Sequence, residues 1–344
     1  MTNKILSVFK GVSETPPPIW MMRQAGRHLP EYLKVRASTN SFIEFCFNPQ
    51  KASQVTLQPV ERYDMDAAIL FADILLIPLA LGRDVRFVKG TGPVLDPISV
   101  SEISKLTSEK VAHQLSPVYE NVSLVRQKLA KNKTLIGFCG GPWTVATYMI
   151  EGQGSPTKEG AKRFAYENPK AMEDLLKHLA ISSADYLIEQ ARAGADVLKI
   201  FESWAEGLSP KLFEKLVIAP TLDIISRVRA AGINKPIIGF PRGSGFNAIK
   251  YAKVTGIDGL ALGTDVPINE IRKSLPENMV TQGNLDPLAL RIGGEALRVA
   301  VQSVLDDIKG PHIFNLGHGV SPDVKIENIH AVINHVRHGD GDYV

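Results

Sequence analysis

The stretch TLIGFCGGPWTVATY, residues 134–148, decides the fold class. Its first seven residues form an apolar run typical of a buried strand. Gly140, Gly141 and Pro142 then end that strand and open a helix that carries Tyr148. A strand followed directly by a helix is the repeating unit of a parallel sheet, because the helix returns the chain to the same edge. The sequence therefore predicts an α/β fold.

Seven further apolar runs end in the same way, in glycine, polar or charged residues, with helical periodicity between them. The predicted strands span residues 18–23, 67–73, 134–140, 196–203, 236–242, 259–264, 280–284 and 312–317. The predicted helices include residues 49–63, 108–131, 158–193, 209–230, 287–309 and 322–336. Eight such strands match a single TIM-type (β/α)₈ barrel. The alternative, an open doubly wound sheet with a small subdomain, lacks the Gly-x-Gly-x-x-Gly that a dinucleotide-binding sheet carries after its first strand.

The organisation of the chain agrees with one barrel. No linker, composition shift or internal repeat divides it, so we expect residues 1–344 to form a single domain. Residues 82–98 are a strand-rich insertion, too long for an ordinary barrel loop, and predict a hairpin over the barrel mouth.

Composition excludes several classes of protein. The chain has 344 residues, 44% hydrophobic and 22% charged, with a net charge of +3, which gives no reason to expect a nucleic-acid or membrane partner. Only two cysteines are present, too few for a disulfide framework or a Cys-rich zinc site. Without a secretory signal or a membrane-spanning run, we expect a cytoplasmic protein.

The chemistry of a barrel lies where its strands end, at the C-terminal edge. The residues that end or directly follow the eight predicted strands are Arg23, Asp73, Gly140, Ser203, Arg242, Thr264, Asn284 and His318. This set has two arginines and one carboxylate. It predicts a mouth that binds an anionic substrate which also presents N–H groups to Asp73.

The motif IWMMRQAGRHLP, residues 19–30, carries the strongest anion-binding signal. Arg23 and Arg27 have no acidic residue within the motif, and a guanidinium is shaped to bind carboxylate or phosphate. Gly26 and Pro30 indicate a shaped loop, so an anionic ligand is favoured over surface salt bridges. His28 is read as a loop residue that forms hydrogen bonds.

Four other residues have competing interpretations. Asp73 interrupts an apolar run, and it is either an N-cap for the next helix or a ligand-binding carboxylate, which we favour. Lys199 is either a Schiff-base lysine or, as we favour, a lysine close to a carboxylate of another strand or helix. Ser203 has no nucleophile-elbow context and is expected to form hydrogen bonds. His318, between two glycines, is expected to face a ligand.

Two more signals are weak. The glycine pair before Pro142 allows close backbone approach, and the helix start favours an anion. Three histidines near the C-terminus, His330, His335 and His338, have no cysteine or carboxylate pattern beside them, so we expect a solvated face and no metal site.

Together these segments resemble the uroporphyrinogen decarboxylase family along nearly the whole chain. The resembling segments are residues 18–36, 68–77, 137–152, 201–209, 239–243, 282–287 and 315–320. The resemblance implies a distorted barrel with its active site at the C-terminal ends of the strands, working as a homodimer in the cytosol without metal or organic cofactor. The implied reaction is removal of the carboxyl groups of the four acetate side chains of uroporphyrinogen III, which gives coproporphyrinogen III.

The resemblance also assigns roles residue by residue. Asp73 matches the aspartate that accepts hydrogen bonds from the pyrrole N–H groups and stabilises a cationic intermediate. Arg23 and Arg27 match arginines that bind acetate and propionate groups, one of them a candidate proton donor. The remaining implied substrate-binding residues are Gln24, Ala25, Gly26, Tyr148, Ser203 and His318.

Three alternative functions stay open from the sequence. A related class of barrels uses zinc to activate thiols for methyl transfer, which requires clustered His and Cys ligands. A Schiff-base aldolase would act through Lys199. A non-catalytic tetrapyrrole carrier would bind uroporphyrinogen without releasing carbon dioxide.

Overall fold

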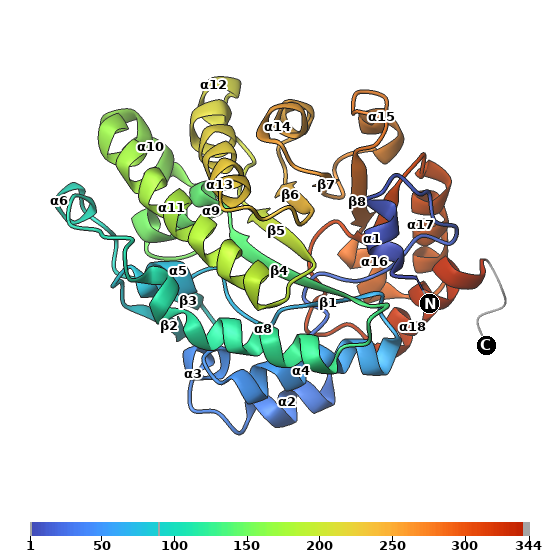
Figure 1. Ribbon diagram of the computed structural model, residues 1–344. Coiled ribbons are helices and arrows are strands. Elements are labelled where there is room, and N and C mark those ends of the chain that lie inside the picture. Colours follow the sequence, from blue (N-terminus) through green and yellow to red (C-terminus); the bar gives the residue numbers. More distant parts are fainter. Residues whose placement is uncertain (1, 89, 340–344) are drawn as a thin grey trace.

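The computed structural model describes residues 2–88 and 90–339, and its centre is a curled parallel sheet (Figure 1). The sheet has seven strands in the order β1-β4-β5-β6-β7-β8-β9, each parallel to its neighbours. The strands are β1 (Ala67–Ile69), β4 (Thr134–Gly140), β5 (Val197–Glu202), β6 (Ile237–Pro241), β7 (Gly259–Ala261), β8 (Val280–Leu285) and β9 (His312–Leu316). Seven of the eight predicted strands are thus confirmed.

The eighth predicted strand, residues 18–23, is shorter than expected. Ile19 forms a single parallel bridge to Phe314 of β9, and the Phe314 N–H donates to the Pro18 carbonyl at 2.9 Å. On its other side Ile19 accepts from the Asp66 N–H at 2.9 Å and donates to the Asp66 carboxylate at 2.8 Å, just before β1. The segment therefore lies between the first and last strands of the sheet. The barrel closes there through a few hydrogen bonds, since the chain turns away after Met21.

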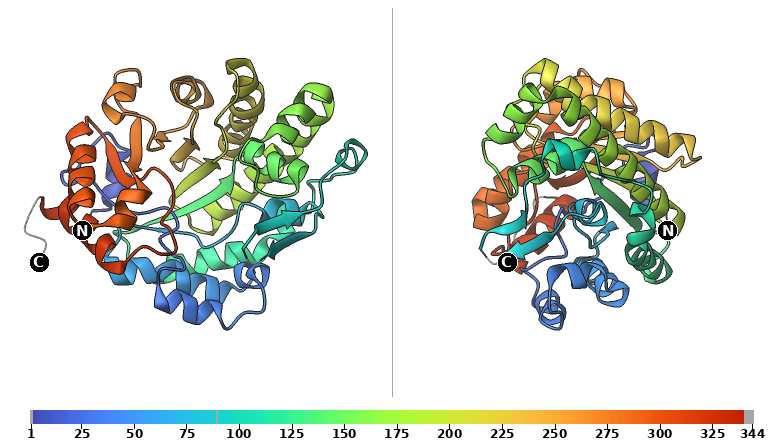
Figure 2. Two further views of the ribbon diagram at one scale, coloured as in Figure 1. Left: turned by 180° about the vertical axis from the view of Figure 1, so that it is seen from behind. Right: turned by 90° about the vertical axis from the view of Figure 1, so that its left-hand side faces the viewer.

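The helices surround the outside of the curled sheet (Figures 1 and 2). Their bounds are α1 (Lys4–Val8), α2 (Pro30–Arg36), α3 (Phe42–Cys46), α4 (Pro49–Tyr63), α5 (Leu76–Ala80), α6 (Val100–Ile103), α7 (Val111–Gln114), α8 (Ser116–Lys128), α9 (Pro142–Glu151), α10 (Glu159–Glu167), α11 (Pro169–Ala193), α12 (Pro210–Phe213), the π-helix η1 (Glu214–Ile218), α13 (Ala219–Ala230), α14 (Asn247–Thr255), α15 (Ile268–Arg272), α16 (Pro287–Ile292), α17 (Gly294–Asp307) and α18 (Ile326–His338). Several begin with proline, which loses no hydrogen bond there because N–H groups in the first turn of a helix have no acceptor within the helix.

The predicted helix over residues 49–63 has the bounds of α4. The structure divides each of the predicted helices over residues 108–131, 158–193 and 287–309 into two. The last is interrupted at Gly293, whose φ of +76° lies outside the right-handed helical region. The segment over residues 209–230 stays helical through η1, and the last predicted helix begins four residues late, at Ile326.

The insertion at residues 82–98 contains the predicted hairpin. β2 (Val85–Val88) pairs antiparallel with β3 (Gly92–Leu95). The Leu95 N–H then donates to the Gly152 carbonyl at 2.7 Å, which joins the hairpin to the C-terminal end of α9. That the hairpin covers the mouth stays a prediction.

Two glycines show which strand residues face the barrel interior. A Cβ at Gly137 or Gly239 would run into Gln190 of α11 or Tyr251 of α14, so both positions point outward. Their neighbours along each strand point inward, because side chains alternate. The inward rings include Phe138, Phe201 and Phe240, and they fill the interior with centroid distances of 5.4 Å and 6.2 Å between consecutive pairs.

Candidate active site at the mouth of the barrel

The arginine loop is fastened to the first strand by Gln24. This side chain is 1% exposed; its Oε1 accepts from the Met21 N–H at 3.0 Å and its Nε2 donates to the Ala67 carbonyl at 2.9 Å. Both polar atoms of the Gln24 side-chain amide therefore form hydrogen bonds within the protein. A role in substrate binding, which the resemblance implies, would fall to its backbone.

The backbone of the loop takes an uncommon form at Arg23, whose φ is +61°. The left-handed region is costly for a residue with a side chain and persists when the surroundings impose it. Gly26 is one such constraint, since a Cβ there would lie 2.9 Å from the Arg23 carbonyl oxygen. The loop thus fixes the direction in which the Arg23 side chain leaves the backbone.

A second glycine makes room for that side chain. A Cβ at Gly319, after β9, would lie 2.8 Å from the Arg23 Cγ and 3.1 Å from its Nε. Two hydrogen bonds hold the segments together: the Met22 N–H donates to the Asn315 side chain at 3.0 Å, and the Val320 N–H donates to the Met22 carbonyl at 2.9 Å. The first and last segments of the barrel build this part of the mouth together.

Arg23 and Arg27 are exposed, and both have unused guanidinium groups. Within residues 2–88 and 90–339, no side chain or carbonyl forms an ion pair or hydrogen bond with either of them. Two charged groups without internal partners in one loop are available to an anionic ligand.

Asp73 forms a hydrogen bond within a local turn, and its carboxylate lies within electrostatic range of Arg23. Its Oδ1 accepts from the Leu75 N–H at 2.8 Å, just before α5. Partial removal from water raises the pKa of Asp73 to about 6, against the opposing effects of the Leu75 hydrogen bond and the Arg23 charge. Asp73 is not the N-cap of α5, which is Leu75, but one of its oxygens accepts within the turn before that helix. No other hydrogen bond to the carboxylate comes from the described residues, and its ligand-binding role stays a prediction.

Tyr148 lies within electrostatic range of both Asp73 and Arg23. Burial raises the pKa of Tyr148 to about 12; the Asp73 charge adds to the rise and the Arg23 charge opposes it. Its ring stacks on Trp204 with centroids 4.1 Å apart and planes at 27°. This stacking fixes the orientation of the tyrosine relative to the end of β5.

His318 directly precedes Gly319, against which the Arg23 side chain packs, and burial keeps its imidazole neutral. Burial lowers its pKa to about 4, and the charges of Arg23 and Arg242 lower it further. The Nδ1 atom is buried and has no hydrogen-bond partner among the described residues. Ser203 is close by through Arg242, whose Nε donates to the Ser203 carbonyl at 3.0 Å. The mouth thus brings Arg23, Asp73, Tyr148, Ser203 and His318 into one region.

Lys199 lies in the barrel interior, away from these groups. Its Nζ is 4.9 Å from the ring centroid of Trp20, 4.8 Å from Phe201 and 5.2 Å from Phe240, and the residue is 2% exposed. The expectation of a neighbouring carboxylate is wrong, since no described carboxylate pairs with it. Burial lowers the pKa of Lys199 well below its usual value. A Schiff base there would require a carbonyl compound to displace the rings.

The sequence did not single out Glu202, the last residue of β5. This fully buried carboxylate accepts from the backbone N–H groups of Trp143 at 3.2 Å and Thr144 at 2.7 Å, and from the Thr144 hydroxyl. Gly141 has no side chain because a Cβ would meet Glu202. The start of α9 is therefore occupied by a carboxyl group of the protein itself. The sequence signal that could have identified Glu202 is an acidic residue at the end of an apolar strand, because a carboxyl group is favoured at the N-terminus of a neighbouring helix.

The Glu202 contacts also position Tyr148. Burial raises the pKa of Glu202 to about 8, with the hydrogen bonds from Thr144 and Trp143 opposing the rise. The Thr144 hydroxyl accepts from the Trp204 N–H at 3.2 Å, and the Trp143 indole donates to the Trp204 carbonyl at 2.9 Å. Since Tyr148 stacks on Trp204, the start of α9 and the end of β5 hold it jointly.

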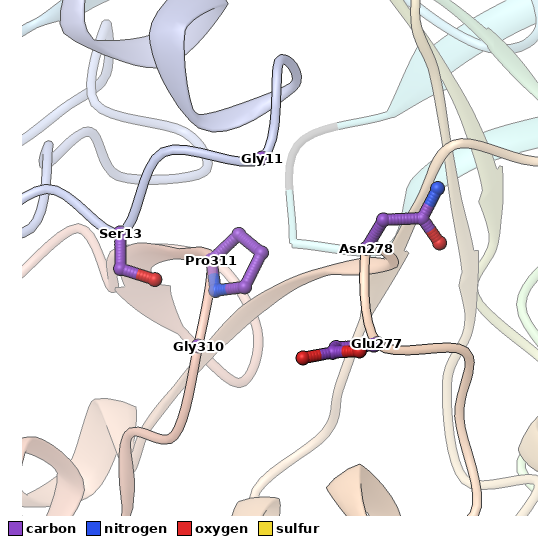
Figure 3. Close-up of a pocket in the computed structure, with 6 residues that line it drawn as sticks. All are labelled: Gly11, Ser13, Glu277, Asn278, Gly310 and Pro311. Carbon is purple, nitrogen blue, oxygen red and sulfur yellow. The ribbon is translucent and has the colours of Figure 1, made fainter.

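One surface pocket lies at the other end of the barrel. Figure 3 shows the side chains of Ser13 and Glu277 directed toward each other across it, and its other lining residues are Gly11, Asn278, Gly310 and Pro311. These residues precede β8 and β9, so the pocket is at the N-terminal ends of the strands. Chemistry in barrels occurs at the C-terminal ends, and we assign it no part in the site.

The described residues offer neither a metal-binding cluster nor a membrane-spanning helix. Within residues 2–88 and 90–339, no three His, Cys, Asp or Glu side chains gather in a way that could hold a metal ion. In the same part of the chain, no helix has the length and apolar character needed to cross a membrane.

Solved structures confirm the fold class. A methyltransferase from Methanosarcina mazei has a TM-score of 0.79 at 17% identity, with 98% of each chain covered. A B12-independent methionine synthase from Shewanella sp. W3-18-1 has a TM-score of 0.51 at 13% identity, covering 85% of this chain and 86% of that one. At such identities the likeness concerns the fold, which is α/β and TIM-barrel-like.

Sequence relatives are far more similar. The uroporphyrinogen decarboxylases of Brucella anthropi and Brucella canis are each 50% identical over 340 residues, covering 98% of this chain and 99% of theirs. Residues 1–339 match the profile of the family described as "Uroporphyrinogen decarboxylase (URO-D)". Together with the arginine loop and Asp73 at one mouth, this match means that the chain belongs to the uroporphyrinogen decarboxylase family.

Proposed function

We propose that the protein is a carboxy-lyase that removes the carboxyl groups of the four acetate side chains of uroporphyrinogen III, leaving methyl groups and giving coproporphyrinogen III. The near full-length 50% identity to curated decarboxylases supports this activity. The observation that carries it is the arrangement at the mouth, where one half-buried carboxylate lies near the exposed, unpaired Arg23.

The reaction requires an electron sink, and a protonated pyrrole provides one. Protonation of a ring carbon gives an iminium-like system that accepts the electron pair of the breaking C–C bond. Asp73 accepts hydrogen bonds from pyrrole N–H groups and stabilises the positive charge that develops on the ring. With a pKa of about 6, Asp73 is mostly ionised at neutral pH, as this role requires.

The arginine loop binds the carboxylates of the substrate. Arg23 and Arg27 are assigned to acetate and propionate groups, with proton donation by one of them as a secondary role. Ala25 and Gly26 shape the loop, and their backbone and that of Gln24 form part of the wall. Each of these assignments is supported by family membership and by the free guanidinium groups.

Three more residues complete the proposed lining. Tyr148, Ser203 and His318 orient the carboxylates that the arginines hold. His318 is neutral, so it can donate or accept a hydrogen bond without adding repulsion to the cationic intermediate.

The decisive experiment is anaerobic incubation with chemically reduced uroporphyrinogen III, with and without a metal chelator. We expect coproporphyrinogen and carbon dioxide, with equal rates in both samples. Tight binding without loss of carboxyl groups would establish the carrier alternative. Loss of activity with chelator would favour zinc chemistry, and borohydride trapping of a carbonyl compound on Lys199 would favour the aldolase.

We further propose a cytoplasmic homodimer, as family membership implies. Light scattering at micromolar concentration measures the mass in solution, and a mass of one chain would contradict the dimer.

A further inference from the structure

Arg242 occupies the mouth beside residues already assigned to it. It directly follows β6, and its backbone N–H donates to the Glu202 carbonyl at 3.0 Å, at the end of β5. Its side chain passes over Gly263 after β7, where a Cβ would lie 3.6 Å from the Arg242 Cγ. The guanidinium thus extends across the C-terminal edge of three neighbouring strands.

The guanidinium contacts two oxygen groups, and only one of them, the more distant Glu206 carboxylate, carries a charge. Its Nε donates to the Ser203 carbonyl at 3.0 Å, which is a neutral acceptor. Its Nη2 is 3.7 Å from the Glu206 Oε1, beyond hydrogen-bond length. The Arg242 side chain keeps 29% of its surface exposed, so the remaining N–H groups are accessible.

Glu206 is paired more closely with Lys158 than with Arg242. The Lys158 Nζ lies 2.6 Å from the same Glu206 Oε1 and also donates to the Pro156 carbonyl at 3.0 Å. Lys158 is 2% exposed, and its backbone has a φ of +52°, in the left-handed region. The residue that pairs with Glu206 is therefore both buried and in an uncommon backbone conformation. Two cations and one anion leave the group Lys158–Glu206–Arg242 with a net charge of +1, and Arg242 is the more distant of the two cations from the shared carboxylate.

The positive charge of Arg242 also acts on His318. Arg23 and Arg242 both disfavour its protonated form, so both guanidiniums lie within electrostatic range of one imidazole. A carboxylate near His318 would therefore meet two cations.

We propose that Arg242 is a further carboxylate-binding residue of the mouth, left only partly neutralised because Lys158 shares Glu206 with it. This inference rests on the proposed function, because a tetrapyrrole with eight carboxylates supplies anions on several sides of the ring. Arg242 holds one of these side-chain carboxylates on the Ser203 and His318 side. Arg23 and Arg27 hold others at the arginine loop.

The first test separates this role from general charge effects by steady-state kinetics with uroporphyrinogen III. We expect Arg242→Gln to raise KM roughly tenfold while kcat changes less than about threefold, since a charge-assisted hydrogen bond is lost. Arg242→Lys should be intermediate, because an ammonium cannot hold both Ser203 and a ligand in one plane. The matched control is Arg227→Gln, which removes the same charge from an exposed pair with Asp223 on α13 and should leave both constants unchanged.

The second test concerns the positioning role of Lys158. Lys158→Met leaves Glu206 to Arg242 alone and removes the net charge of +1, so KM should rise as in Arg242→Gln. The double variant Lys158→Met/Glu206→Gln restores the net charge of +1, and its KM should return toward the wild-type value. A merely structural Lys158 would give a double variant at least as impaired as the single one, which would overturn the positioning role.

The outcomes distinguish this inference from the proposed function. A wild-type protein that releases no carbon dioxide contradicts the proposed function itself. An active wild type in which Arg242→Gln behaves like Arg227→Gln contradicts only the role of Arg242. Circular dichroism checks the fold of each variant, and if Arg242→Gln fails to fold, Arg242→Lys and the double variant still decide.

Discussion

The mouth and the interior of the barrel each hold a cation that lacks a counterion, and they treat it in opposite ways. Arg23 at the mouth is exposed and, among the described residues, unpaired. Lys199 in the interior is equally unpaired within that part of the chain, but it is 2% exposed and faces three aromatic rings. Arginine stays protonated at any physiological pH, whereas burial drives the lysine toward its neutral form.

The difference shows when an unpaired cation indicates a ligand. At the mouth the charge persists because water solvates it until an anion arrives. In the interior burial favours the neutral amine, which needs no anion beside it. An unpaired basic residue therefore points to anion binding only where its charge is retained.

Removing the single mouth carboxylate should have the largest effect. Asp73→Asn retains the side-chain oxygen that caps the Leu75 N–H, so the fold should be preserved. We expect kcat to fall by roughly a hundredfold or more, because a preorganised charge opposite the cationic intermediate is lost. Activity assays beside thermal melting measure both effects, and a fully active variant would remove Asp73 from the mechanism.

Changing the arginine should have the next largest effect. Arg23→Gln should lower kcat/KM by roughly ten- to a hundredfold, the cost of one charge-assisted contact. Gly319→Ala offers a matched perturbation, since it keeps the charge and displaces the Arg23 side chain. A similar loss in both variants would show that position matters as much as charge. An unaffected Gly319→Ala enzyme would contradict the fixed geometry of Arg23.

The corresponding change in the interior should act on stability alone. Lys199→Met replaces a buried amine without an acceptor by an apolar side chain of similar length, and should raise the free energy of unfolding by about 1–3 kcal/mol. The kinetic constants should stay within about twofold. Urea denaturation measures the change, and a destabilised variant would mean that the rings hold a protonated lysine.

The acid dependence of stability should show the smallest effect. His28, His312 and His318 have pKa values lowered to about 4 by burial, so between pH 6.5 and 4 the unfolded chain binds more protons. The free energy of unfolding should therefore decrease as the pH is lowered from 6.5 to 4, by on the order of 1 kcal/mol per histidine. Asp73 opposes this between pH 3.8 and 6, because its raised pKa makes the native state the better proton binder. His318→Gln should flatten the slope by about one proton, and an unchanged slope would place His318 in water.

The sequence predicted the alternation of strands and helices and the residues at the strand ends, because burial and punctuation are local signals. Helix α4 was predicted residue for residue, and seven strands were found where expected. The first strand was overestimated because its apolar residues pack as a strand would, while the turn after Met21 depends on contacts with Asn315 and Gln24.

Contacts across the barrel could not be predicted. Whether Lys199 meets a carboxylate or three rings depends on strand register, which no single sequence states. The pairing of Lys158 with Glu206, and the hold of Glu202 on the start of α9, likewise join segments that are close only after folding. Residue types at the mouth were legible, and their partners were not.

The closure of the barrel through Ile19 and Phe314 has a consequence for biosynthesis. The arginine loop is synthesised before every strand of the sheet, but β9, to which it also docks, is made after the other six. Until β9 is made, the loop lacks the contacts with Phe314 and Asn315 that help to hold it. A chain that stopped before β9 would contain Arg23, Arg27 and Asp73 and would still have no mouth to hold them.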